Sequence, residues 1–180
     1  MQELIQIKML KYFLVNPYQE VYLTELSKIL KISTFATKKN AEILLREGLI
    51  NDERKANLRY FKAGINSPFF KYLKIAFSID LLLKSGLLDF LRENIPNLSS
   101  IVLFGSTAKG LDTIESDIDI LIVGQKKQLN LTRFEKELGR EITIHTFSWS
   151  EWNEKARTDK PFYFEVISHG IPIFGELPII

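Results

Sequence analysis

Two aspartates, Asp117 and Asp119, stand at the entry to the apolar run Ile120-Leu121-Ile122-Val123. Side chains alternate along a β-strand, so these two carboxylates point to the same face. Two carboxylates so close together repel each other unless a cation lies between them. Mg²⁺ prefers oxygen ligands and usually completes its shell with water and substrate phosphates. The pair therefore predicts a metal site at the start of a strand.

Ten residues separate a glycine–serine pair from these aspartates. Gly105-Ser106 ends the apolar run Ser100–Phe104, whose composition is typical of a buried strand. Backbone N–H groups and a hydroxyl at such a break suit a phosphate group. The alternative is an ordinary turn followed by a surface Asp-Ile-Asp. Together with the aspartates, the turn predicts a site for a nucleotide and a metal ion.

Gly-Ser, ten residues and Asp-x-Asp on an apolar strand resemble the signature of the minimal nucleotidyltransferases, a branch of the DNA polymerase β-like superfamily. The resemblance includes Ala108-Lys109-Gly110 and Ser116, and it covers roughly residues 98–175. It implies that ATP or another NTP is bound by Gly105, Ser106 and Lys109, and that Asp117 and Asp119 bind Mg²⁺ and act in catalysis. The same signature also resembles antitoxins that modify a partner toxin, which implies a protein acceptor.

The superfamily places a third carboxylate on the strand after the central helix, and Thr143 holds that place here. A threonine hydroxyl cannot serve as an anionic ligand or as the general base. Glu141 and His145 share the face of Thr143, but each lies two residues, about 7 Å, away along a strand. Metal–oxygen contacts tolerate only about 0.2 Å. Glu141 can therefore act in catalysis only if the strand is shifted in register or bulged.

Two functions remain open on these residues. The first is an enzyme that transfers a nucleoside monophosphate from Mg²⁺–NTP to a hydroxyl acceptor and is coupled to a DNA-binding domain. The second is a DNA-binding transcriptional regulator whose nucleotidyltransferase-like domain senses a nucleotide with little or no catalysis.

Composition and charge bound the rest of the 180-residue chain. It contains no cysteine and only two histidines, which excludes disulfides and argues against zinc. The chain begins with Met1-Gln2-Glu3 and helix-spaced apolar residues, so we expect no signal peptide and a cytoplasmic location. Residues 1–66 carry 11 Lys and Arg against 7 Asp and Glu, whereas residues 67–180 carry 13 against 15. This asymmetry predicts two domains with different partners.

Helix-spaced apolar residues predict three helices in the basic first third, the second capped by Thr24 and the third ended by Gly48. Leu49-Ile50 and Leu58–Ala63 flank a polar loop, Asn51–Asn57, which predicts a hairpin with a charged tip.

Over residues 4–64, three helices and a charged hairpin resemble the winged helix-turn-helix domain of prokaryotic regulators. The runs Leu23–Ser33 and Leu44–Ile50 carry the resemblance. It implies double-stranded DNA as a partner, with the third helix in the major groove and the hairpin on the backbone or minor groove. The alternative is a protein-interaction domain with solvated polar faces. The residues that would be exposed and face DNA are Thr34, Thr37, Lys38, Lys39, Asn40, Arg54, Lys55 and Arg59.

A strongly apolar segment, residues 69–91, follows the predicted linker Asn66-Ser67-Pro68. Lysines interrupt it, so we expect no membrane span, and Gly86 divides it into two helices. A helix that is apolar nearly all round must be covered on most sides, either as a core helix or in a homodimer.

Alternating apolar and amphipathic segments after residue 97 predict strand, helix, strand, helix and strand. The expected fold class is α+β with two domains. We expect a winged helix-turn-helix domain over residues 1–66, a helical linker over 67–96, and an α/β nucleotidyltransferase-like domain with a small mixed sheet over 97–180.

Overall fold

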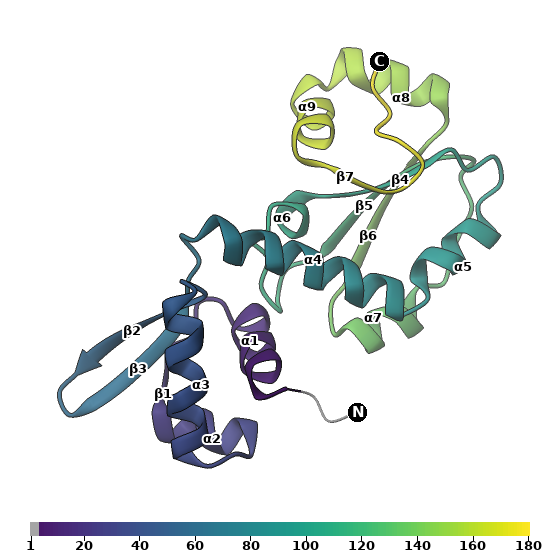
Figure 1. Ribbon diagram of the computed structural model, residues 1–180. Helices are drawn as coiled ribbons and strands as arrows, with labels where there is room; N and C mark the ends of the chain where they lie inside the picture. Colours follow the sequence, from purple (N-terminus) through teal and green to yellow (C-terminus); the bar gives the residue numbers. More distant parts are fainter. Residues whose placement is uncertain (1–3) are drawn as a thin grey trace. The chain divides into compact units, whose positions relative to one another are not determined.

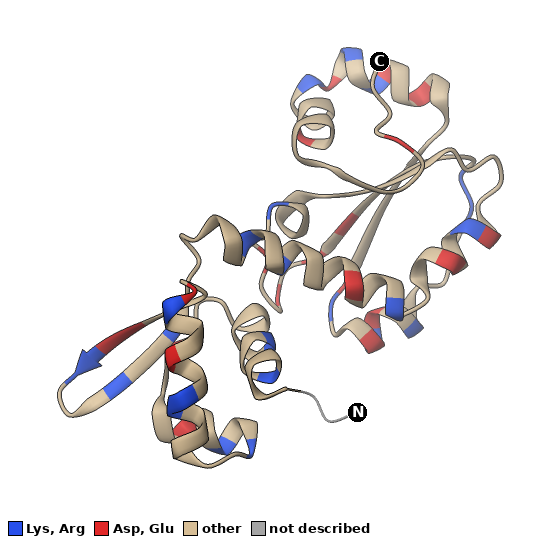
Figure 2. Ribbon diagram, viewed as in Figure 1, with Lys and Arg blue, Asp and Glu red and all other residues tan. Residues whose placement is uncertain are grey.

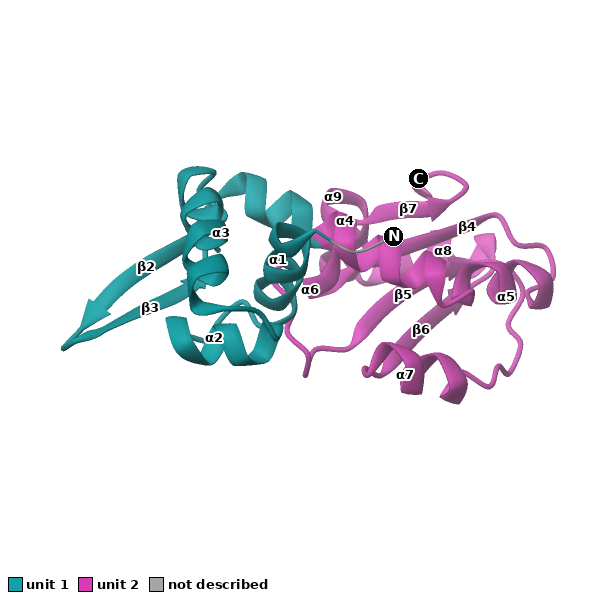
Figure 3. Cartoon of the chain, turned by 60° about the horizontal axis from the view of Figure 1, so that its bottom comes forward, with its two compact units in different colours: residues 1–74 teal, residues 75–180 magenta. Residues whose placement is uncertain are grey.

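The computed structural model describes residues 4–180, and the chain divides into two compact units, Met1–Lys74 and Ile75–Ile180 (Figure 3). The boundary falls within one continuous helix, α4 (Pro68–Lys84), which therefore contributes residues to both units. The domain limits expected at residues 66 and 96 remain a prediction about units of function. Among residues 4–180, no helix is both long enough and apolar enough to cross a bilayer.

The first unit combines three helices with a three-stranded antiparallel sheet in the order β1–β3–β2. Its core is formed by side chains such as Met9, Phe13, Leu26 and Phe61, all of which are completely buried. The elements are α1 (Ile5–Val15), β1 (Val21–Tyr22), α2 (Leu23–Leu30), α3 (Thr34–Arg46), β2 (Ile50–Lys55) and β3 (Leu58–Ala63).

Two local predictions in this unit are wrong. Thr24 does not cap α2, because the cap position is Tyr22, whose extended backbone pairs with Tyr60 and leads the chain directly into the helix. The segment Asn51–Asn57 is not a loop, because β2 continues to Lys55 and only Ala56-Asn57 form the turn. Strand β2 is exposed from Asn51 to Lys55, so its polar residues remain in solvent and do not interrupt the strand pairing.

The second unit is built on a four-stranded mixed sheet in the order β6–β5–β4–β7 (Figure 1). Strand β5 pairs antiparallel with β4 and parallel with β6, and β7 pairs antiparallel with β4. This confirms the expected mixed sheet. The elements are α5 (Leu87–Asn94), β4 (Ser100–Phe104), α6 (Gly105–Ala108), β5 (Ile118–Val123), α7 (Thr132–Leu138), β6 (Ile142–Phe147), α8 (Trp149–Thr158), α9 (Lys160–His169) and β7 (Ile171–Phe174).

Helices cover both faces of this sheet. Side chains alternate along its central strands, so each of these strands contributes apolar residues to both faces. On one face, residues such as Leu103 and Ile120 pack with Leu87 and Leu91 of α5 and with Phe134 of α7. On the other face, the buried residues are Val102, Phe104, Leu121 and Val123, packed with Trp152 of α8 and Val166 of α9. Asp119 lies in register with this second face, so its carboxylate belongs to the side that α9 covers.

Gly86 separates α4 from α5 as predicted, in a left-handed conformation with φ +74° that favours glycine. Helix α4 is not covered on all sides within the described chain, since Phe69, Tyr72 and Leu83 are exposed. A homodimer through this helix stays a prediction.

Candidate functional site

The two aspartates lie at the start of β5, which is one of the two central strands of the sheet. Asp117 is exposed and immediately precedes the strand, whereas Asp119 is half-buried and pairs with Phe104 on β4 and Thr143 on β6. Burial raises the pKa of the Asp119 carboxyl above its ordinary value. Electrostatic interactions with His145 and Arg140 lower this pKa, whereas the negative charge of Asp117 raises it further. The carboxylate pair therefore favours a cation.

Gly105 brings the predicted phosphate-binding turn directly against Asp119. Its backbone is left-handed, with φ +69°, and a Cβ built on it would overlap Oδ2 of Asp119. Both features exclude any other residue type at this position without a rearrangement. Ser106 follows Gly105 in α6. The structure therefore brings Gly105 and Asp119 together, and the binding roles of Gly105, Ser106 and Asp119 stay predictions.

Lys109 follows α6 as its C-terminal cap residue, and its side chain points to α9. Its Nζ lies 2.5 Å from Oε1 of Glu165, whose Oε2 lies 3.4 Å from Nδ1 of His169. The negative charge of Glu165 also contributes to the raised pKa of Asp119, so it lies within electrostatic reach of that carboxyl. Sequence reasoning missed Glu165 because a single glutamate on an amphipathic helix carries no motif.

Thr143 is the residue of β6 directly opposite Asp119, the place expected of the third carboxylate. Glu141 lies just before β6, and its side chain is exposed, while its carbonyl accepts a hydrogen bond from the N–H of Ile118. His145 lies farther along β6, with its ring centroid 5.6 Å from that of Phe104 and 5.4 Å from that of Phe162. The strand is regular here, so neither a bulge nor a register shift moves Glu141 to the place of Thr143.

Arg140, which the sequence analysis did not single out, organises the loop that leads to the aspartates. Its guanidinium forms an ion pair with Asp112 at 2.8 Å and donates to Oγ1 of Thr107 at 2.8 Å. It also donates to the carbonyl oxygens of Ser116 at 2.6 Å and Asp117 at 2.9 Å. One arginine thus connects α6, the loop and the entry to β5.

Among residues 4–180, no group of three or more His, Asp or Glu side chains is arranged to hold a metal ion. The metal ligands predicted from the sequence are two carboxylates, those of Asp117 and Asp119. Such a pair fits Mg²⁺, which is commonly bound through one or two carboxylates together with substrate phosphates.

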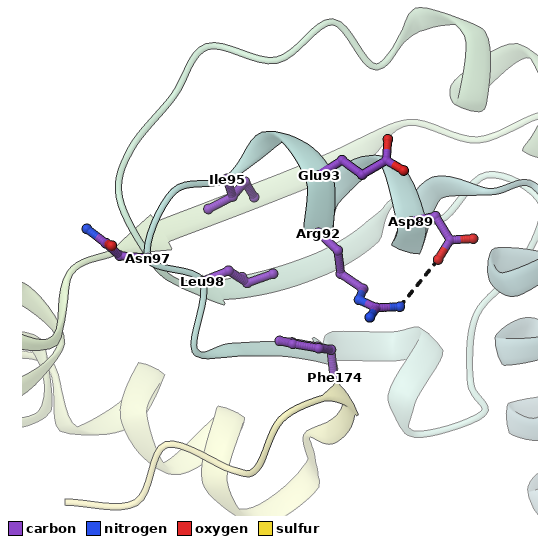
Figure 4. Close-up of a pocket in the computed structure, with 7 residues that line it drawn as sticks. All are labelled: Asp89, Arg92, Glu93, Ile95, Asn97, Leu98 and Phe174. Atoms are coloured by element: carbon purple, nitrogen blue, oxygen red, sulfur yellow. Dashed lines mark hydrogen bonds and ion pairs between the residues drawn. The ribbon is translucent and has the colours of Figure 1, made fainter.

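A separate pocket lies at the opposite end of β4, away from the aspartates (Figure 4). In this pocket, the guanidinium of Arg92 lies over the ring of Phe174, and its Nη1 is 3.5 Å from Oδ1 of Asp89. Its lining residues are Asp89, Arg92, Glu93, Ile95, Asn97, Leu98 and Phe174. None of them was a predicted site residue.

On the first unit, the predicted DNA-facing residues divide into two groups. Thr34, Lys38 and Lys39 are exposed on α3, but Thr37 and Asn40 are buried, so the expectation that they are exposed is wrong. Their spacing places them on the core face of α3. The Thr37 hydroxyl donates to the carbonyl of Ser33 and the Asn40 amide to that of Ala36, which satisfies both inside the helix.

The basic residues of the β2–β3 hairpin lie among acids. Arg54 and Lys55 are exposed, but Lys55 forms an ion pair with Glu20. Arg59 is half-buried and pairs with Glu42 and, at 2.5 Å, with Asp52. Figure 2 shows both signs of charge on α3 and on this hairpin.

Residues 84–162 match the family model described as "Nucleotidyltransferase domain", a segment that includes every predicted nucleotide and metal residue. No curated protein matches the chain.

Solved structures give weaker matches. "Crystal structure of the toxin-antitoxin with AMP-PNP" is 23% identical with TM-score 0.38, over 54% of this chain and 73% of that one. A crystal structure of a mutant form of the toxin-antitoxin MntA-HpeT is 24% identical with TM-score 0.37, over 52% and 72%. "Structure of TrmBL2, an archaeal chromatin protein, shows a novel mode of DNA binding" is 10% identical with TM-score 0.29, over 93% and 71%. TM-scores this low do not establish a common fold, so these matches assign no function to the chain.

Proposed function

We propose that the second unit binds Mg²⁺ and an NTP and transfers a nucleoside monophosphate to a hydroxyl acceptor. The observation that carries this proposal is the close approach of the Gly105 backbone to the Asp119 carboxylate, which leaves no room for a Cβ and supports a single site for the turn and the aspartates. The match of residues 84–162 to the nucleotidyltransferase domain supports it.

The roles of the individual residues follow from their positions. Asp117 and Asp119 would hold Mg²⁺, which when bound neutralises phosphate charge and orients the α-phosphate. Gly105, Ser106 and Lys109 would hold the triphosphate. Because Lys109 is paired with Glu165, a bound triphosphate must share the ammonium group with that carboxylate or displace it.

In the transfer, the acceptor oxygen bonds to the α-phosphorus, and the bond from that phosphorus to the pyrophosphate oxygen breaks. Pyrophosphate leaves, and the hydroxyl proton passes to a base. Thr143 cannot take this proton as a carboxylate would, and general-base help is worth roughly 10²–10⁴ in rate. We therefore expect slow transfer. The acceptor is a hydroxyl on a protein, such as a partner toxin, on a nucleic acid or on a small molecule.

A nucleotide sensor with little or no catalysis is the second candidate function. The specific observation in its favour is Thr143 opposite Asp119 in a regular strand pairing. Binding of Mg²⁺–NTP needs only the two aspartates and the turn, so it survives the loss of the third carboxylate.

We further propose that the first unit is a winged helix-turn-helix that binds double-stranded DNA. Its support is the order helix, strand, two helices and two strands, with β1 paired to β3, and the exposed Lys38 and Lys39 on α3. Lys55 and Arg59 form ion pairs with acidic residues, which reduces the positive charge that the hairpin presents to DNA phosphates.

Calorimetric titration with ATP, with and without Mg²⁺, tests the site, and label transfer from ATP labelled at the α-phosphate tests turnover. We expect Mg²⁺-dependent binding with weak or no label transfer. The matched variant carries Asp117→Asn and Asp119→Asn, which keep side-chain size and remove both charges, and it should lose the Mg²⁺ dependence. Equal nucleotide affinity in the two proteins would show that the site assignment is wrong.

A further inference from the structure

We propose that Arg140 is a positioning residue that holds Asp117 in place for Mg²⁺ and nucleotide. This inference rests on the proposed function of the site. Arg140 donates from Nε to the carbonyl of Ser116 and from Nη2 to the carbonyl of Asp117. These two consecutive carbonyls lie immediately before β5, so the arginine fixes the backbone of the first aspartate directly.

The same guanidinium is anchored on the chain that leaves the glycine–serine turn. Nη1 lies 2.8 Å from Oδ2 of Asp112, and Nη2 donates to Oγ1 of Thr107 at 2.8 Å. The side chains of Arg140 and Asp112 are only 11% and 4% exposed. Thr107 follows Ser106 in α6, so Arg140 sets the spacing between the turn and the aspartate across the loop.

The two aspartates are held differently, which makes this contact consequential. Asp119 lies inside β5 and has strand partners on both sides, Phe104 and Thr143. Asp117 lies outside the strand and is exposed, and the first ladder bond on the β6 side is made by the N–H of Ile118. The contacts of Arg140 therefore supply to Asp117 the restraint that the sheet supplies to Asp119.

Only arginine can make this set of contacts. Its planar fork carries five N–H donors, whereas lysine offers a single ammonium group on a flexible stem. Four of these five N–H donors are used in hydrogen bonds, and all four bonds are directed at the protein. Arg140 is thus placed to orient the metal ligand and not to contact the substrate.

The test is ATP binding by the full chain as a function of Mg²⁺ concentration. We compare the wild type with Arg140→Lys, and with Arg92→Lys as the matched control, because Arg92 lies at the opposite end of β4. We expect Arg140→Lys to raise the Mg²⁺ midpoint about tenfold or more, the effect of losing one charge-assisted hydrogen bond. ATP affinity in EDTA and the midpoint of the control should stay unchanged.

Thr107→Val keeps side-chain shape and removes one anchor of the guanidinium, so it guards against a lysine variant that fails to fold. It should shift the Mg²⁺ midpoint in the same direction by a smaller factor. An unchanged Mg²⁺ midpoint in both variants overturns the inference. A parallel loss of affinity with and without Mg²⁺ overturns it too, because a merely structural role would act that way. A wild type that binds no nucleotide overturns the proposed function together with this inference.

Discussion

Asp119 carries its charge in an unfavourable environment, because its carboxylate is half-buried beside Asp117 and against Gly105. Its pKa is raised above the ordinary 3.8, chiefly by burial. The protonated Asp119 carboxyl therefore contributes to the free energy of unfolding. This contribution is fully present below the unfolded pKa and is lost as the pH rises through the folded pKa. At neutral pH the ionised carboxylate therefore destabilises the metal-free fold.

We expect Asp119→Asn to unfold at a higher temperature than the wild type in EDTA at pH 7, because the variant buries no charge. This difference should shrink when the measurement is repeated at acidic pH, because protonation then removes the charge from the wild-type carboxyl. Mg²⁺ with ATP should stabilise the wild type and leave the variant unchanged. Scanning calorimetry at the two pH values measures all three effects. A variant that is less stable than the wild type at pH 7 in EDTA would contradict the assigned electrostatics.

Thr143 is the second residue on which function depends, since it faces Asp119 where a base is needed. We expect Thr143→Asp to increase label transfer from ATP by up to about 10²-fold, within the range of general-base catalysis. Thr143→Asn is the control, because asparagine has the size of aspartate without its charge. Its rate of label transfer should equal that of the wild type. If the wild type is fully active and Glu141→Gln abolishes the activity, Glu141 is the base and this prediction is wrong.

At the level of elements, the sequence predicted the parts of the site that follow from strand periodicity. Asp117 and Asp119 were recognisable because a period of two places them on one face. Thr143 was singled out only because the family resemblance implies a carboxylate at that place on the following strand. Arg140 and Glu165 were not recognisable, because each is a lone charged residue whose partner near the site, Asp112 for Arg140 and Lys109 for Glu165, is distant in sequence. Thr37 and Asn40 were misassigned because polar residues can be buried when the preceding helical turn accepts their hydrogen bonds.

Helix α3 should carry most of the DNA affinity of the first unit, since Lys55 and Arg59 of the hairpin are paired with acids. We expect Lys38→Ala with Lys39→Ala to reduce the slope of log affinity against log salt by about 2, one unit per lost phosphate contact. Lys55→Ala should change the slope less, because Lys55 already pairs with Glu20. Fluorescence anisotropy with duplex DNA at several salt concentrations measures both slopes. Binding that is absent or independent of salt would favour a protein-interaction domain instead.

At the scale of the whole molecule, α4 is shared by two units whose predicted ligands differ. The groups proposed for Mg²⁺–NTP, including Gly105, Asp117 and Asp119, all belong to Ile75–Ile180, and those proposed for DNA all belong to Met1–Lys74. A ligand shifts a conformational equilibrium only through differential interactions with its states. No residue belongs to both sets. Nucleotide and DNA therefore influence each other only if binding in one unit changes the conformational equilibrium of the other.

We expect Mg²⁺–ATP to slow amide hydrogen exchange around the turn and the aspartates and to leave α3 and the β2–β3 hairpin unchanged. Duplex DNA should do the reverse. The chain with Asp117→Asn and Asp119→Asn is the control, and ATP should change none of its amides. If ATP instead alters exchange in α3, the two sites are coupled. By reciprocity DNA must then change ATP affinity by the same factor that ATP changes DNA affinity. That outcome would contradict independent units and favour the nucleotide-sensing regulator over the enzyme, because a sensor requires such coupling and a transferase does not.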